Sequence, residues 1–215
     1  MTTPTKPLIH WFTATSTTTD KPIHDMPVIL VPILWGLLAY TAGSINWGYP
    51  VARRYGVDIV TTGNRNPGAA NVFRVVGPLP GVIVYLADML TATVVVAPTH
   101  WLPLSDACML VASGMVIVGT MFPVFSHFRG GTGLAKSTGV AAGINPLGLL
   151  LALPLGLFVL GTLRNGAWAG VLGLGVVLLA SAFISHDAVG VISIAMVGAL
   201  IFIRSRVQYR GGRKA

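Results

Sequence analysis

The sequence predicts an all-α integral membrane protein with about seven transmembrane helices. Of its 215 residues, 53% are hydrophobic and 9% are charged. The mean hydropathy of +0.76 exceeds what a soluble domain of this size carries without a very large exposed apolar patch. Long uncharged runs recur along the chain, and a membrane-crossing helix needs about 20 predominantly apolar residues. Together these observations place the chain in a lipid bilayer.

The positive charge of the chain indicates topology and contact with lipid. Lys and Arg number 14 against six Asp, which gives a net charge of +8, and the sequence contains no Glu. The basic residues gather at the ends of apolar runs, which is typical of topology signals and of contacts to anionic lipid. We therefore expect membrane lipids as partners and no nucleic acid. The single cysteine, Cys108, is expected to be buried and inert.

The chain is expected to divide into three parts. Residues 1–26 form a Thr-rich, mostly polar tail without an apolar core long enough for a signal peptide. A multi-span transmembrane domain is expected over residues 27–203, and a basic cytoplasmic tail over residues 204–215. The first span is expected at about 27–49. The loop after it is basic and carries Arg53, Arg54, Arg65 and Arg74.

The second and third spans are expected at about 75–97 and 105–126, and a second polar loop runs from His127 to Lys136. Asp88 falls near the middle of the second span. An ionisable side chain at that depth is costly, so it normally has a partner or a function. The alternative interpretation is that Asp88 only forms a hydrogen bond to a neighbouring helix.

The uncharged stretch 137–163 decides the topology. It is interrupted by Asn145-Pro146 and by Pro154, so it can cross the membrane once or as two short helices. One crossing gives six spans and places the basic C-terminal tail outside, against the positive-inside rule. Two crossings give seven spans, with the N-terminus outside and the C-terminus in the cytoplasm, and we favour this topology. The last spans are expected at about 166–185 and 188–203.

Two Gly-rich polar loops, 50–74 and 127–136, then lie on the same cytoplasmic face and are expected to meet at one site. Their glycines let backbone N–H groups approach an anion closely, and their arginines donate charge-assisted hydrogen bonds. This composition is typical of phosphate-binding loops. We expect neither a metal ion nor a cofactor. Glycines within the spans, among them Gly139 and Gly173, are expected to serve close helix packing.

Several short motifs occur in a specific order and spacing: Gly43-Ser44-Ile45, Asp58-Ile59, Asn66-Pro67-Gly68-Ala69 with Asn71 and Arg74, Asp88, Gly119, Phe122-Pro123-Val124-Phe125, Phe128, and Gly130-Gly131 with Gly133. With these motifs the chain resembles, over about residues 30–212, the bacterial acyl-phosphate:glycerol-3-phosphate acyltransferases, the PlsY family. Its members are small seven-span enzymes that start phospholipid synthesis by moving an acyl chain from acyl phosphate to glycerol 3-phosphate.

The resemblance implies a location in the bacterial cytoplasmic (inner) membrane. It also implies a set of residues that contact phosphate or lipid. These residues are Ser44, Gly63, Asn66, Gly68, Asn71, Arg74, Arg129, Gly130, Gly131 and Gly133.

The chain departs from the family pattern at positions that carry chemistry. Asn64 stands where the family has a serine, Ala70 where it has a threonine, Thr91 and Thr132 where it has lysines, and Thr120 where it has a histidine. The family's C-terminal glutamate has no counterpart. Acyl transfer needs a base for the attacking hydroxyl and cations for the phosphate groups. A threonine hydroxyl supplies neither at neutral pH.

Two functional hypotheses follow. The favoured one is a catalytically degenerate family member that serves as an accessory, lipid-contacting subunit beside other membrane proteins. The alternative is an active acyltransferase of phospholipid biosynthesis, with His127 or a water held by Asp88 as the base. In that case the phosphate-holding residues are Arg65, Arg74 and Arg129, and Lys136 is a further source of compensating charge. A transporter or channel is disfavoured, because only Asp88 places charge well inside a span.

Overall fold

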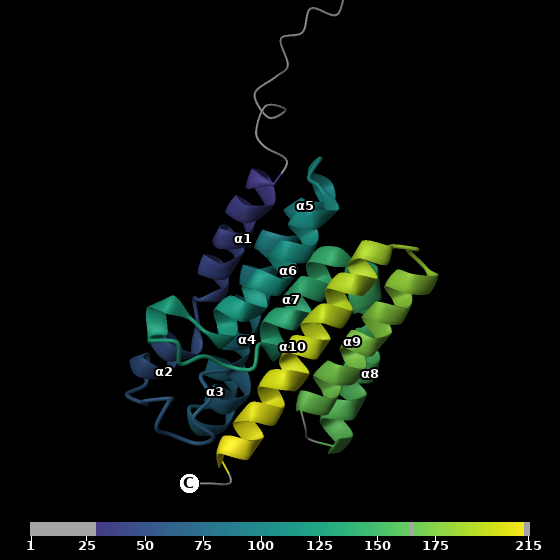
Figure 1. Cartoon of the computed structure of the whole chain (residues 1–215). Coiled ribbons are helices and arrows are strands. Elements are labelled where there is room, and N and C mark those ends of the chain that lie inside the picture. The colour runs from purple at the N-terminus through teal and green to yellow at the C-terminus, as the bar shows by residue number, and fades with distance from the viewer. Residues whose placement is uncertain (1–28, 164–165, 213–215) are drawn as a thin grey trace, which may run out of the picture.

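The computed structural model describes residues 29–163 and 166–212, and every regular element in this part of the chain is a helix (Figure 1). The expected N-terminal tail lies outside the described residues. Seven of the described helices have eleven residues or more: α1 (Leu30–Gly43), α4 (Pro78–Val96), α6 (Asp106–Met121), α7 (Leu134–Ile144), α8 (Pro146–Leu163), α9 (Gly166–Phe183) and α10 (Ala188–Gly212). The shorter elements are α2 (Gly48–Arg54), α3 (Ala69–Val75), α5 (Pro98–Trp101) and the 3₁₀ turn η1 (Val124–Ser126).

Three segments of the described chain are long and apolar enough to cross a membrane. They are Pro78–His100, Asp106–Ser126 and Ala188–Arg206, with mean hydropathies of 1.9, 2.0 and 2.1. Two shorter apolar helical stretches are Pro146–Val159 and Gly170–Phe183. These segments fit the all-α membrane class that the sequence predicts. The number of crossings and the orientation of the termini stay predictions.

The first expected span ends earlier than its apolar run. Residues 27–49 were expected as one helix, whereas α1 ends at Gly43 and α2 begins at Gly48. The carbonyl of Ile45, in the segment between the two helices, accepts a hydrogen bond of 2.9 Å from the Lys136 ammonium. The expected basic loop 50–74 also contains two short helices, α2 and α3.

The stretch 137–163 breaks into two helices, as the sequence predicts, and the break falls at Asn145-Pro146. A proline lacks the backbone N–H and disfavours helical geometry in the residue before it. The Asn145 side chain supplies hydrogen bonds at the break. Its Oδ1 accepts the Gly148 N–H at 2.8 Å, and its Nδ2 donates to the hydroxyls of Ser181 and Ser185. Pro154 stays inside α8.

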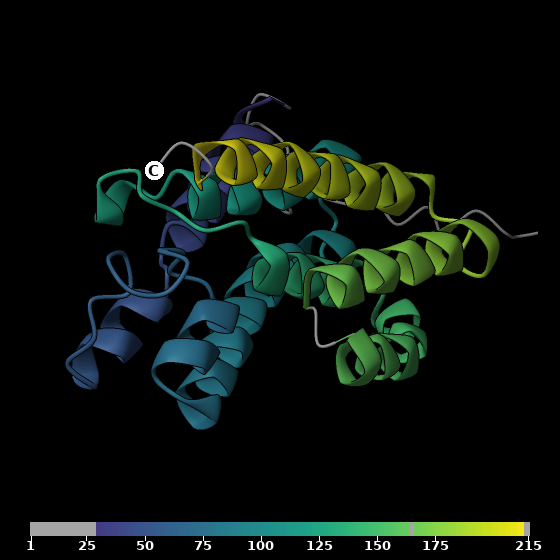
Figure 2. The same ribbon diagram turned by 90° about the horizontal axis from the view of Figure 1, so that it is seen from below.

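The helices pack as a bundle in which α1 lies against α6, and α4 against α7 (Figure 1). The last helix, α10, packs against both α6 and α9, while α8 and α9 form a hairpin at one side of the bundle (Figure 2). The main core contains mostly small and β-branched residues, such as Ala39, Ala112, Val116 and Val140. Cys108 is buried in the same region, as expected.

Glycines bring the helix backbones into direct contact. A Cβ at Gly119 on α6 would lie 2.2 Å from the Tyr40 carbonyl on α1, and one at Gly139 on α7 would lie 2.1 Å from the Met89 carbonyl on α4. Small residues at such crossings are typical of membrane helix pairs. The packing role predicted for Gly139 is therefore confirmed. The same prediction for Gly173 is wrong, since no heavy atom from elsewhere in the described chain lies within 4 Å of its Cβ position.

We expect Gly119→Ala to destabilise the bundle, because the new methyl group meets the backbone of α1 and forces the two helices apart. Overpacking of this kind costs about 1–3 kcal/mol. Gly173→Ala is the matched control, and it should leave stability unchanged or raise it, since alanine favours a helix by about 1 kcal/mol over glycine. The measurement is the melting temperature of each variant in detergent, which should be lower for Gly119→Ala than for Gly173→Ala. Equal values would contradict the packing role of Gly119.

Candidate functional site

The second polar loop folds back against the end of α6. After η1, His127 and Phe128 adopt left-handed backbone angles, with φ of 49° and 60°. The Gly131 N–H then donates to the Thr120 carbonyl at 3.1 Å. Gly130 fits in this turn because it lacks a side chain: a Cβ there would lie 2.1 Å from the same carbonyl oxygen. The turn that the sequence marks with glycines is therefore shaped by the end of α6.

The first polar loop is held by a buried asparagine. Asn71 is 1% exposed, and its Oδ1 accepts the Asn64 N–H at 3.1 Å. Its Nδ2 donates to the carbonyls of Thr62 and Ile59 at 3.0 and 3.4 Å. Asn66 Oδ1 accepts the Gly68 N–H at 3.0 Å, directly before α3. These side-chain amides replace backbone pairing and fix the loop.

The two loops meet, as the sequence predicts. A Cβ at Gly131 would lie 2.9 Å from Asn66 Oδ1, so the two turns touch. The Tyr49 hydroxyl on α2 donates to the Arg129 carbonyl and joins the second loop to the segment before the first. A phenol is protonated at neutral pH and so can donate, and burial raises the pKa of Tyr49 further above its ordinary value of 10.0.

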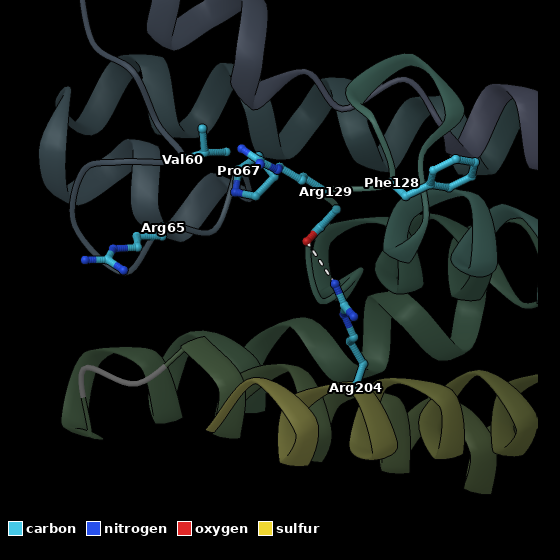
Figure 3. Close-up of a pocket in the computed structure, with 7 residues that line it drawn as sticks. Val60, Arg65, Pro67, Phe128, Arg129 and Arg204 are labelled. Atoms are coloured by element: carbon cyan, nitrogen blue, oxygen red, sulfur yellow. Dashed lines mark hydrogen bonds between the residues drawn. The ribbon is translucent and has the colours of Figure 1, made fainter. Parts of the chain in front are cut away.

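An open pocket of about 400 Å³ lies where the loops meet the last helix. Its lining residues are Val60, Arg65, Pro67, Phe128, Arg129, Gly130 and Arg204 (Figure 3). Three of these residues carry a guanidinium group and none is acidic. Arginine binds phosphate oxygens through two parallel N–H donors. The composition of the pocket therefore suits a phosphate group.

The predicted site residues take three kinds of position. Arg129 and Gly130 line the pocket, and Asn66 and Gly131 lie at the contact between the loops. Five other predicted site residues do not line the pocket: Ser44, Gly63, Gly68, Asn71 and Gly133. Arg74 and His127 are exposed and do not line the pocket. Arg65, which was expected to hold phosphate, does line it.

The sequence analysis missed Arg204 as a site residue. It was assigned to a C-terminal tail starting at residue 204, whereas α10 continues to Gly212 and carries Arg204 to the pocket. Its signal in the sequence is an arginine that directly follows a long apolar run, and that pattern also fits a topology signal.

Asp88 is paired inside the bundle and does not line the pocket. Its carboxylate on α4 forms an ion pair with the Lys136 ammonium on α7, and the two side chains are 7% and 0% exposed. Lys136 also donates to the Ile45 carbonyl at 2.9 Å. The pair therefore joins α4 and α7 to the turn after α1, and the partner expected for Asp88 is Lys136.

The threonine at the family's histidine position has a structural role. Thr120 is 4% exposed, and its hydroxyl donates to the carbonyls of Val116 and Gly43 at 2.8 and 3.3 Å. It binds α6 to α1 and is not placed to accept a proton from a substrate. Thr91, at a family lysine position, accepts the Trp47 indole N–H at 3.0 Å.

These observations define a class: a helical membrane protein with an arginine-lined pocket between two Gly-rich loops and the last described helix. The chain belongs to the glycerol-3-phosphate acyltransferase family, whose model matches residues 33–211. Among its relatives, the glycerol-3-phosphate acyltransferase of Geotalea daltonii is 31% identical over 80% of this chain and 89% of its own length. The one of Geobacillus kaustophilus is 34% identical over 79% of this chain and 86% of its own length.

The fold agrees with this membership. The crystal structure of PlsY, an integral membrane glycerol 3-phosphate acyltransferase in its glycerol 3-phosphate form, matches with a TM-score of 0.76 and 26% identity, over 83% of this chain and 90% of that one. The lysophosphatidic acid form of PlsY gives a TM-score of 0.75. The chain is thus a membrane protein of this family. The favoured prediction of a degenerate accessory subunit gains no support, since the relatives carry the name of the enzyme.

We expect Lys136→Met to unfold the bundle at a much lower temperature, because it leaves the Asp88 carboxylate buried without a partner. Breaking a buried pair in this way costs about 3–5 kcal/mol. The double variant Asp88→Leu with Lys136→Met should recover most of that loss. Melting temperatures of the wild type, both single variants and the double variant test this coupling. If the decrease in melting temperature of the double variant equals the sum of the decreases in the two single variants, the two side chains do not stabilise each other.

Proposed function

We propose that this protein is an active glycerol-3-phosphate acyltransferase that takes the acyl group from an acyl phosphate. The observation that carries the proposal is the pocket between the two Gly-rich loops, with Arg65, Arg129 and Arg204 around it. Membership of the family supplies the reaction, and the pocket supplies a place for a phosphorylated substrate.

The arginines replace part of the positive charge that lysines supply in the family and that this chain lacks at Thr91 and Thr132. A phosphate monoester carries about two negative charges at neutral pH, as a phosphorylated side chain does. Guanidinium groups bind it and also stabilise the negative charge that develops on the carbonyl oxygen during acyl transfer. Thr132 has no charge to contribute, whereas Arg65 and Arg129 come from the two loops that meet beside it.

The lining residues include no base that titrates near pH 7. His127 is exposed and lies outside the lining set, and Asp88 is paired with Lys136. The proton of the attacking hydroxyl then passes to a phosphate oxygen of a bound substrate or to water. In this mechanism the protein holds and orients the two substrates, and its arginines stabilise charge.

We expect the purified protein in lipid vesicles to form lysophosphatidic acid from acyl phosphate and labelled glycerol 3-phosphate. Arg129→Gln should lower kcat/KM by about 10²-fold, because it removes one electrostatic donor from the pocket. Arg53→Gln is the control, since Arg53 is an exposed arginine of α2 that does not line the pocket. No product above a heat-treated sample would overturn the proposed activity, and the accessory-subunit hypothesis would then need testing.

We further propose seven spans in the bacterial cytoplasmic membrane, with the N-terminus outside and both Gly-rich loops and the C-terminus in the cytoplasm. The presence of seven described helices of eleven residues or more supports this topology, as does the contact of α10 with the second loop. Exposed apolar side chains of α8, such as Leu157 and Phe158, are proposed to face lipid.

In a variant without Cys108, we expect Gly56→Cys to react with a membrane-impermeant thiol reagent only from the cytoplasmic side. The reason is that residue 56 follows the basic helix α2, which the positive-inside rule retains in the cytoplasm. His186→Cys, in the turn between α9 and α10, should react only from the outside. Labelling of both positions from one side would contradict the seven-span topology.

A further inference from the structure

Arg204 reaches the pocket from α10, the last of the described helices. Its Nη2 donates to the Gly130 carbonyl at 3.4 Å (Figure 3). The same Nη2 donates to the Met121 carbonyl at 3.4 Å, and the Cζ of Arg204 lies 5.2 Å from the centre of the Phe122 ring. All three partners belong to the end of α6 or to the second Gly-rich loop. Arg204 therefore links α10 to that loop.

The bonds of Arg204 leave most of its hydrogen-bonding capacity unused. A guanidinium group has five N–H donors, and hydrogen bonds of 3.4 Å lie at the long end of the useful range. The Nε atom of Arg204 is buried and has no hydrogen-bond partner. A buried, unpaired donor costs free energy unless a ligand or water completes it.

Arg204 also lacks a counterion in the part of the chain that the structure describes. The described ion pair is that of Lys136 with Asp88, and the pocket adds Arg65 and Arg129 to Arg204 without an acidic lining residue. A bound anion would neutralise positive charge that these lining residues bring to the pocket. Geometry and charge thus both leave a place for an anion beside Arg204.

We propose that Arg204 is a phosphate-binding residue of this site, which donates its free N–H groups to the phosphate of a phosphate monoester such as glycerol 3-phosphate. The inference rests on the proposed function for the identity of the substrate. When the anion binds, short charge-assisted bonds satisfy the buried donor. Because Nη2 also contacts the Gly130 carbonyl, the bound phosphate tightens the second loop against α10.

The test is direct binding of glycerol 3-phosphate and of inorganic phosphate to the full chain in detergent, measured by titration calorimetry without acyl donor. Arg204→Gln keeps an N–H donor for the Gly130 carbonyl but removes the charge. We expect its affinity for both ligands to fall by about 10- to 100-fold, the value of a hydrogen bond to a charged group. Arg204→Lys keeps the positive charge but lacks the planar guanidinium group. Its affinity for both ligands should therefore lie between that of the wild type and that of Arg204→Gln.

Arg206→Gln is the matched control. Arg206 lies on the same helix, is exposed, and its Cζ sits 4.9 Å from the centre of the Phe202 ring instead of lining the pocket. It should bind both ligands like the wild type. An equal loss in both glutamine variants would overturn the proposal, because general attraction by positive charge would then explain the affinity.

Two other outcomes also overturn it: unchanged binding by Arg204→Gln, and an equal loss in the lysine and glutamine variants together with a lower melting temperature without ligand. The second outcome would indicate that Arg204 only holds the loop. Failure of the proposed function looks different. A wild type that binds glycerol 3-phosphate through Arg204 but forms no lysophosphatidic acid retains the site and lacks the activity.

Discussion

The ion pair of Asp88 and Lys136 is the constraint on which the arrangement of the site depends. A buried charge has no water to solvate it, so the carboxylate and the ammonium must stay together with their hydrogen bonds complete. The first Gly-rich loop leads through α3 into α4, which carries Asp88, and the second leads directly into α7, which carries Lys136. The pair therefore fixes the relative height of the two helices, and with it the heights of both loops.

The glycines then determine how closely the loops approach. Backbone contacts at Gly119 and Gly139 hold α1 against α6 and α7 against α4, and the turn at Gly130 folds onto the end of α6. A chain with larger residues at these places would keep its spans but separate the loops. The pocket is thus a product of helix packing as much as of its own polar residues.

Much of this architecture follows from local rules. A break near a proline is predictable because proline lacks the backbone N–H, but the sequence does not choose between Pro146 and Pro154, and the second stays inside α8. Counting spans places the two loops on the same face, which allows them to meet. The partner of Asp88 is 48 residues away in the sequence, so no local pattern identifies it. The sequence analysis assigned Arg204 to the C-terminal tail for a related reason. An arginine that follows an apolar run gives the same sequence pattern whether it contacts lipid headgroups or lines a pocket.

The pocket wall that α10 supplies has a consequence for biogenesis. During synthesis both Gly-rich loops emerge well before Arg204, and the whole α8–α9 hairpin is inserted between them and α10. A nascent chain that has inserted only up to α9 has two of the three guanidinium groups of the pocket. Its second Gly-rich loop also lacks the hydrogen bond from Arg204 to the Gly130 carbonyl. Under the proposal for Arg204, completion of the anion site waits for insertion of α10, and binding of a phosphate ligand is then expected to report on finished membrane assembly.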